Sequence, residues 1–169
     1  QILGVYDKNL VLPIARVIKD LKIKRAMVVH SQDGLDEISC EKDTYVAELK
    51  DGDITEYTIN PKDFGINILP LDSLKVSTVE ESYKIFIDML NNKNNAAVNI
   101  VSLNAGAAIY ISGIKEDLKS GIEFAKEIIS SGKALKKFED IKKSMPENIS
   151  TPKILEEILE NKVKEVAER

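Results

Sequence analysis

The chain has 169 residues, of which 43% are hydrophobic and 31% are charged, and this is enough apolar material for the core of one ordinary domain. Its 24 basic and 28 acidic residues give a net charge of −4, which argues against a nucleic-acid partner, because nucleic-acid-binding surfaces are strongly basic. Cys40 is the only cysteine and His30 the only histidine, which excludes an internal disulfide, a cysteine-based zinc cluster and a multi-histidine metal site.

No secretory signal peptide is recognisable in the sequence. The longest uncharged run, residues 94–114, contains several Asn and Ser residues and is too polar to span a bilayer. We therefore expect a cytoplasmic protein without a membrane segment. The first residue is Gln1, which indicates a chain that begins partway through a longer one.

The first forty residues predict a helix followed by a buried strand. A short apolar run at residues 3–6 precedes apolar residues that recur at helical spacing over residues 10–21. The β-branched run 26–29 then predicts a strand, which ends in a polar, glycine-containing turn over residues 30–37. A helix followed by a strand in this order favours an α/β layer structure.

The next segment predicts a β-hairpin. Residues 45–50 alternate with period two, Asp51-Gly52 tolerates positive φ, and residues 54–59 are again rich in β-formers. Asn60-Pro61 ends the second strand, and residues 62–74 read as irregular.

The following part of the chain predicts helices. Ser77 or Thr78 can form a capping box with Glu80 or Glu81, and the helix that follows should bury one face, formed by Tyr83, Phe86, Ile87 and Leu90. Residues 97–111 are apolar nearly all round and predict a buried helix, in which the amide of Asn104 is expected to be satisfied by a packing or backbone contact. Residues 118–129 predict an amphipathic helix with Gly132 at its C-terminal cap, and residues 135–141 form a further short helical face.

Residues 144–152 are polar and contain two prolines, so they predict a linker between a domain of residues 1–143 and a helix of residues 153–169. Thr151 and Pro152 suit the start of that amphipathic helix.

The polar turn after the first buried strand is the candidate functional site. Open α/β sheets present ligand-binding side chains where a strand ends, and Asp36 and Glu37 are adjacent hard-oxygen donors. Mg²⁺ is commonly held by one or two carboxylates together with substrate phosphates and water. The alternative interpretation is an ordinary solvated acidic loop, and composition alone leaves both open.

Several short motifs resemble one family. Together they cover roughly residues 1–142 and resemble the C-terminal half of anthranilate phosphoribosyltransferase: Val5-Tyr6-Asp7, Arg25-Ala26-Met27-Val28-Val29-His30, Asp33-Gly34-Leu35-Asp36-Glu37, Asn60-Pro61-Lys62-Asp63-Phe64-Gly65, Asn104-Ala105-Gly106-Ala107-Ala108-Ile109-Tyr110 and Ser130-Ser131-Gly132-Lys133-Ala134.

The resemblance implies an α/β fold, namely the C-terminal part of a nucleoside-phosphorylase-like domain with a mixed sheet, a β-hairpin and flanking helices. It implies transfer of a phosphoribosyl group from phosphoribosyl pyrophosphate to anthranilate in tryptophan biosynthesis, and a homodimer when complete. In that family the Asp-Glu pair holds Mg²⁺ on the pyrophosphate, and the matching residues here are Asp36 and Glu37. No catalytic or other cofactor-binding residue is assigned.

The chain also departs from the family. The glycine-rich Gly-Thr-Gly-Gly-Asp loop and the Lys-His-Gly-Asn segment are absent, and the usual Gly-Gly pair is replaced around Leu74-Lys75-Val76. Both missing segments would lie upstream of Gln1, so we expect no transfer activity from these 169 residues alone. The alternative function is a non-catalytic binding module or paralogue of the same superfamily. A nucleoside phosphorylase of the same fold fits the motifs less well.

The tail, residues 145–169, resembles the N-terminal helix of indole-3-glycerol-phosphate synthase, a (β/α)₈ barrel enzyme of the same pathway. This resemblance implies a fusion of two enzymes, with the tail as the start of the second domain.

Overall fold

The computed structural model describes residues 1–144. The chain divides into two compact units, residues 1–133 and residues 134–169. Apart from Ser144, the predicted linker lies outside the described residues, as do the tail helix and the segment that resembles indole-3-glycerol-phosphate synthase. Every helix in the described part is too short or too polar to traverse a lipid bilayer.

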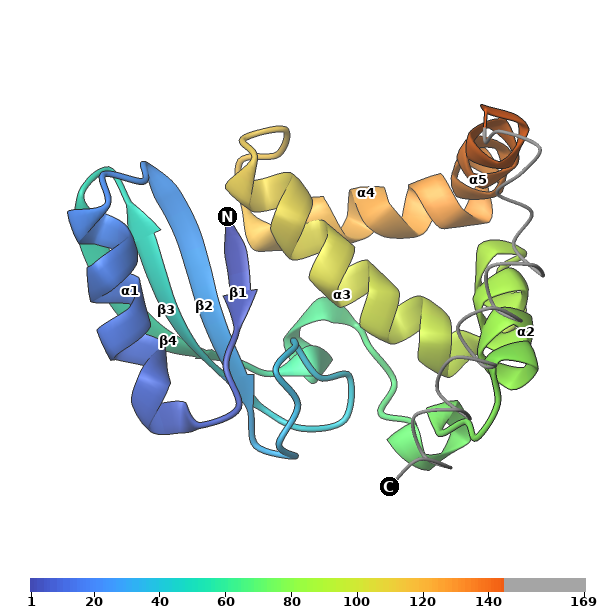
Figure 1. The fold of residues 1–169 in the computed structure, drawn as a ribbon, viewed down its shortest axis with the longest axis horizontal. Coiled ribbons are helices and arrows are strands. Elements are labelled where there is room, and N and C mark those ends of the chain that lie inside the picture. The colour runs from blue at the N-terminus through green and yellow to red at the C-terminus, as the bar shows by residue number, and fades with distance from the viewer. Residues whose placement is uncertain (145–169) are drawn as a thin grey trace, which may run out of the picture. The chain divides into compact units, whose positions relative to one another are not determined.

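The first unit is built on a mixed four-stranded sheet with the strand order β1-β2-β3-β4 (Figure 1). β1 pairs in parallel with β2, whereas β3 and β4 continue the sheet in antiparallel fashion. The strands are β1 (Ile2–Gly4), β2 (Arg25–Ser31), β3 (Thr44–Lys50) and β4 (Asp53–Ile59). This mixed sheet with flanking helices confirms the predicted fold class.

Helices cover both faces of the sheet (Figure 1). On one face, α1 (Val11–Asp20) packs against Ala26 and Val28 of β2. On the other face, Met27 and Val29 contact a core that α3 (Asn95–Ile111) and α4 (Leu118–Ser130) complete. Successive side chains of a strand point to opposite faces, so a β2 that is buried on both faces reads as a continuous apolar run.

The predicted hairpin between β3 and β4 is confirmed. Asp51 has φ 52° and Gly52 has φ 90°, and the strands on either side pair from Lys50 and Asp53 outward. Positive φ at both central residues is the requirement of a type I′ turn, which Asp-Gly meets at low cost.

The predicted helix signals are confirmed as well. Thr78 and Glu81 form a reciprocal capping box at the start of α2 (Val79–Leu90). Gly132 follows α4 with φ 74°, the left-handed conformation expected just beyond a helix end. The last described helix is α5 (Lys133–Ser144).

The prediction of the buried face of α2 is wrong in part. Tyr83 is 49% exposed and Phe86 is 39% exposed, whereas the buried residues of α2 are Met89 and Leu90 in its last turn. A helical period identifies an apolar stripe, but the burial of that stripe depends on which neighbours the fold supplies.

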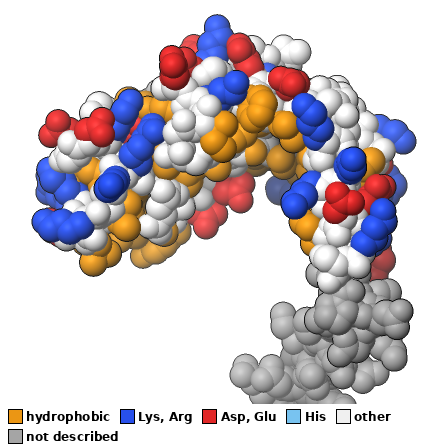
Figure 2. All heavy atoms as spheres, turned by 90° about the horizontal axis from the view of Figure 1, so that it is seen from above, with side chains coloured by type: hydrophobic (Ala, Val, Ile, Leu, Met, Phe, Trp, Pro, Cys, Tyr) orange, Lys and Arg blue, Asp and Glu red, His pale blue; other side chains and the backbone are white. Residues whose placement is uncertain are grey.

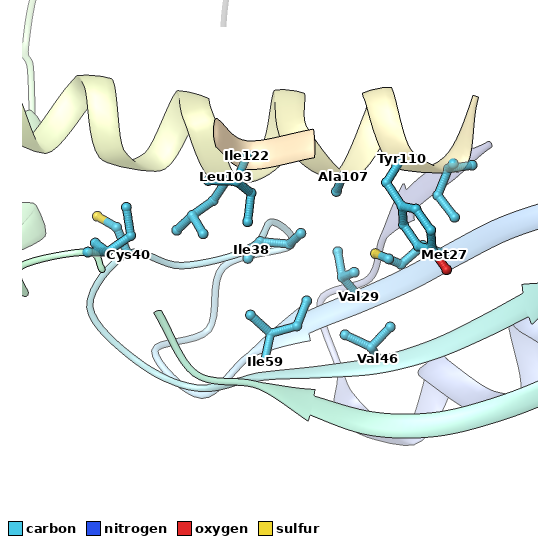
Figure 3. Close-up of a cluster of buried hydrophobic side chains, with 12 residues drawn as sticks. Met27, Val29, Ile38, Cys40, Val46, Ile59, Leu103, Ala107, Tyr110 and Ile122 are labelled. Atoms are coloured by element: carbon cyan, nitrogen blue, oxygen red, sulfur yellow. The ribbon is translucent and has the colours of Figure 1, made fainter. Parts of the chain in front are cut away.

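Helices α3 and α4 approach each other closely at two glycines. A Cβ atom on Gly106 would lie 2.5 Å from Cα of Ile122, and one on Gly121 would lie 2.4 Å from the carbonyl oxygen of Gly106. Because neither position has a side chain, α3 and α4 pack closely, and Ile122 of α4 joins the core between α3 and the sheet (Figure 3).

On the surface that Figure 2 presents, basic and acidic side chains are interspersed, with apolar side chains between them. Neither positive nor negative side chains form a continuous patch over that face, which agrees with the small net charge of −4.

Candidate functional site

The acidic turn begins where β2 ends. The backbone N–H of Ser31 donates to Leu35 O at 2.9 Å, and that of Gly34 donates to Ser31 O at 3.0 Å. Gly34 has φ 90°, which a side chain would disfavour. Since β1 and β2 are parallel, the turn lies at the carboxyl edge that the two strands share, where α/β sheets bind ligands.

Asp33 organises this turn from within. Its Oδ1 accepts from Ser31 Oγ at 2.5 Å and from the Leu35 N–H at 3.3 Å, and its Oδ2 accepts from Ser39 Oγ at 2.5 Å. Burial alone would raise the pKa of Asp33, but the hydrogen bonds from Ser31, Ser39 and the backbone outweigh it, and the pKa lies below its usual value. The Asp33 carboxylate is thus committed to holding the loop.

The second half of the turn is anchored in the core. Ile38 lies between α3 and the sheet, below Leu103 and above Ile59 (Figure 3). Ser39 and Cys40 are also fully buried, and the Ser39 N–H donates to Thr44 Oγ1 at 3.1 Å. Burial raises the pKa of the Cys40 thiol, against a smaller lowering by a backbone hydrogen bond.

Asp36 and Glu37, the predicted metal ligands, lie between these two fixed parts, and both are exposed. The peptide group that joins them lies against Gly4 of β1, where an added Cβ would lie 1.5 Å from Asp36 O. On their C-terminal side, the side chain of Asn104 in α3 exchanges two hydrogen bonds with the backbone of Ile38, both 2.9 Å long. The predicted backbone contact of Asn104 is therefore confirmed.

His30 ties the neighbouring strand end to the same edge. Its Nδ1 lies 2.8 Å from Val5 O, and since a carbonyl oxygen can only accept, Nδ1 carries the hydrogen. The Val5 N–H in turn donates to Val29 O at 2.9 Å. His30 thus links the end of β2 to the segment that follows β1.

The residues present fit Mg²⁺ under one condition. Among residues 1–144, no group of three His, Cys, Asp or Glu side chains lies close enough together to hold a metal ion. Asp36 and Glu37 supply two hard carboxylates, and Asp33 is occupied by its hydroxyl and backbone partners. This donor set suits an ion whose remaining ligands are phosphate oxygens and water, which is the usual manner of Mg²⁺ binding.

A second polar cluster was missed by sequence reasoning. Glu48 of β3 is only 8% exposed, and its two carboxylate oxygens accept from the hydroxyls of Tyr57 and Tyr110, each at 2.7 Å. Burial, followed by the hydrogen bond to Glu48, raises the pKa of both tyrosines. All three residues line a cavity of about 290 Å³ to which the acidic turn contributes nothing.

The sequence pattern of β3 does not reveal this cluster. Glu48 shares its strand face with Thr44, Val46 and Lys50, a mixed set that resembles a solvated face, so the alternation in the sequence gives no sign that this carboxylate is buried.

The molecule is therefore an α/β domain with its candidate site at the carboxyl edge of a parallel strand pair. Residues 1–135 match the family model described as "Glycosyl transferase family, a/b domain", and the chain belongs to this family.

Named relatives are similar to most of this chain. An anthranilate phosphoribosyltransferase of Vesicomyosocius okutanii is 49% identical over 140 residues, which is 83% of this chain and 41% of that protein. The enzyme of the same name from Clostridium kluyveri is 48% identical over 141 residues, or 83% of this chain and 42% of that protein. The chain spans about two fifths of the length of the curated relatives it matches.

Solved structures agree in fold. The anthranilate phosphoribosyltransferase of Thermus thermophilus superimposes with a TM-score of 0.70 at 30% identity, covering 78% of this chain and 39% of that one. The Saccharomyces cerevisiae enzyme, solved in complex with phosphoribosyl pyrophosphate and Mg, superimposes with a TM-score of 0.70 at 26% identity. That comparison covers 82% of this chain and 40% of the yeast chain.

Proposed function

We propose that this chain is the metal-binding part of an anthranilate phosphoribosyltransferase, a Mg-dependent glycosyltransferase of tryptophan biosynthesis. The observation that carries the proposal is an identity of 49% over 140 residues to an enzyme of that name, over most of the chain. The backbone contacts that hold Asp36 and Glu37 in the turn after β2 support the proposal independently.

The proposed reaction forms one bond and breaks one. The amine nitrogen of anthranilate bonds to the anomeric carbon of the ribose, the bond from that carbon to pyrophosphate breaks, and pyrophosphate keeps its electron pair. The amine releases one proton to solvent. When bound, Mg²⁺ supplies positive charge that stabilises the departing pyrophosphate.

In this proposal the chain contributes two things. Asp36 and Glu37 hold the ion on the pyrophosphate, and Asp33 keeps the turn that carries them in one conformation through its two serine partners. A reaction of this kind needs positioning and charge stabilisation more than acid–base groups, so a single histidine that is engaged with a backbone carbonyl is no obstacle.

The test is loss of anthranilate fluorescence in the complete protein that carries this sequence, with phosphoribosyl pyrophosphate and Mg²⁺ present. We expect Asp36→Ala and Glu37→Ala each to lower turnover by about 100-fold or more, as loss of a charged transition-state contact does, and to raise the Mg²⁺ concentration needed for half-maximal rate. Glu123→Ala, which removes an exposed carboxylate from α4, is the matched control and should leave turnover unchanged.

Unchanged kinetics in both turn variants would overturn the assignment of the metal site. Consumption of thymidine in place of anthranilate would favour a nucleoside phosphorylase. Absence of any transfer in the complete protein would favour the non-catalytic binding module.

We also propose a homodimer and a fusion to indole-3-glycerol-phosphate synthase, and a place in the cytoplasm. The fusion rests on the resemblance of residues 145–169, and the location on a single, buried free cysteine, which suits a reducing compartment. Intact mass of the endogenous protein tests the fusion, and light scattering of the purified protein tests the dimer. A mass of 18.8 kDa would exclude the fusion.

A further inference from the structure

The Asp36–Glu37 pair is held from outside the turn by two residues, each from a different element of the fold. Gly4 ends β1, and Asn104 lies within α3. Both touch backbone and not carboxylate, so their effect falls on where the peptide groups of the pair lie.

The amide of Asn104 makes three hydrogen bonds, two of them with the backbone of Ile38. Its Oδ1 accepts from the Ile38 N–H at 2.9 Å, and its Nδ2 donates to Ile38 O and to Ile100 O, both at 2.9 Å. An amide that pairs with the N–H and the C=O of one residue fixes the rotation of that residue as well as its position. Ile38 directly follows Glu37, so the fixed orientation of Ile38 sets the direction in which the Glu37 side chain extends from the backbone.

Gly4 acts by having no side chain. An added Cβ would lie 1.5 Å from the Asp36 carbonyl oxygen and 2.5 Å from its carbonyl carbon. Any other residue at this position would push the Asp36 peptide group away from β1. The φ angle of Gly4 is not positive, so this contact is what requires glycine here.

We propose that Asn104 and Gly4 are positioning residues of the metal site, which hold the peptide group between Asp36 and Glu37 and the peptide group that follows Glu37, so that both carboxylates meet one ion. This inference rests on the proposed function, because it assumes that the pair binds a metal. Exposed carboxylates have free rotamers, so the backbone from which they extend is the part of the site that the fold can fix. Groups that orient metal ligands in this way typically change metal affinity by about 10- to 100-fold when they are lost.

The experiment measures Mn²⁺ binding in the presence of pyrophosphate, by electron paramagnetic resonance, in the complete protein that carries this sequence. Asn104→Leu removes the amide at similar volume, Asn104→Asp keeps the shape but loses both donated hydrogen bonds, and Gly4→Ala displaces the Asp36 peptide. We expect each to weaken Mn²⁺ binding about 10-fold or more. The control is Ile129→Ala, which removes a buried side chain of α4 and lowers stability without touching the turn.

A second readout separates positioning from general stability. Backbone chemical shifts of residues 36 and 37, and hydrogen exchange of the Ile38 amide, should change in the Asn104 variants and stay unchanged in Ile129→Ala. Unchanged Mn²⁺ affinity in folded Asn104→Leu, or an equal loss in Ile129→Ala, would overturn the positioning role and leave the proposed function standing. Wild-type protein whose Mn²⁺ binding does not depend on Asp36 and Glu37 would overturn both.

Discussion

Replacement of Asp33 by Asn tests whether this carboxylate holds the acidic turn together. In Asp33→Asn, the new side chain would keep one oxygen for Ser31 but place an NH₂ group against Ser39 Oγ. That hydroxyl already accepts from the N–H groups of Glu41 and Lys42, at 2.9 and 3.1 Å, so it has no acceptor site left for the new donor. The hydrogen bond between residues 33 and 39 is therefore lost without replacement.

The size of the effect follows from that one bond. A hydrogen bond to a charged group contributes about 1.5–3 kcal/mol, and because Asp33 is exposed on its other side, about 2 kcal/mol is the appropriate figure. For a protein of this size, each kcal/mol corresponds to about 2–4 °C in melting temperature, so Asp33→Asn should melt about 4–8 °C lower at pH 7.

The pH dependence gives a sharper test. The pKa of Asp33 is lower in the folded chain than its usual value, so its stabilising contribution is complete above the usual pKa and is lost as the pH falls through the folded pKa. The gap between wild type and Asp33→Asn should thus narrow below about pH 4. Asp43→Asn makes the same charge change in the same loop and is the control. Equal melting temperatures for the two variants at pH 7, or a gap that persists in acid, would refute the reasoning.

Two further substitutions test the packing that carries the turn. Gly106→Ala should lower the free energy of unfolding by about 1–3 kcal/mol in a denaturant titration, because its Cβ meets backbone of α4, although the same change at an open helical site stabilises by about 1 kcal/mol. A gain in stability would show that α3 and α4 separate freely. Tyr110→Phe should lower the free energy of unfolding by about 1–3 kcal/mol, because one carboxylate oxygen of the buried Glu48 loses its hydrogen-bond donor. A variant as stable as wild type would mean that water satisfies this carboxylate.

Local patterns carried the prediction of most elements. The hairpin follows from Asp51-Gly52 and the start of α2 from Thr78 and Glu81, because turn and cap chemistry involves only neighbours in sequence. The position of the acidic turn at the end of a buried strand could be predicted for the same reason.

Long-range contacts could not be predicted in this way. Asn104 meets Ile38 across 66 positions, and the burial of Glu48 depends on a tyrosine 62 positions away. The partner of each polar group is decided by how α3 crosses the sheet, which a periodic pattern does not specify. The exposure of Tyr83 has the same cause, because the helical period identifies the apolar face of α2 but not the element that would cover it.

The buried Cys40 can be used to measure how often the acidic turn opens. It is the only thiol in the sequence, it is fully buried beside Ser39, and its pKa is raised, so an alkylating reagent can reach it as a thiolate only when this segment swings open. The labelling rate at low reagent concentration therefore measures the free energy of that local opening, separately from global unfolding. Ligands that bind to Asp36 and Glu37 would slow the labelling in proportion to their occupancy. The labelling rate of Cys40 therefore also measures ligand binding at the acidic turn.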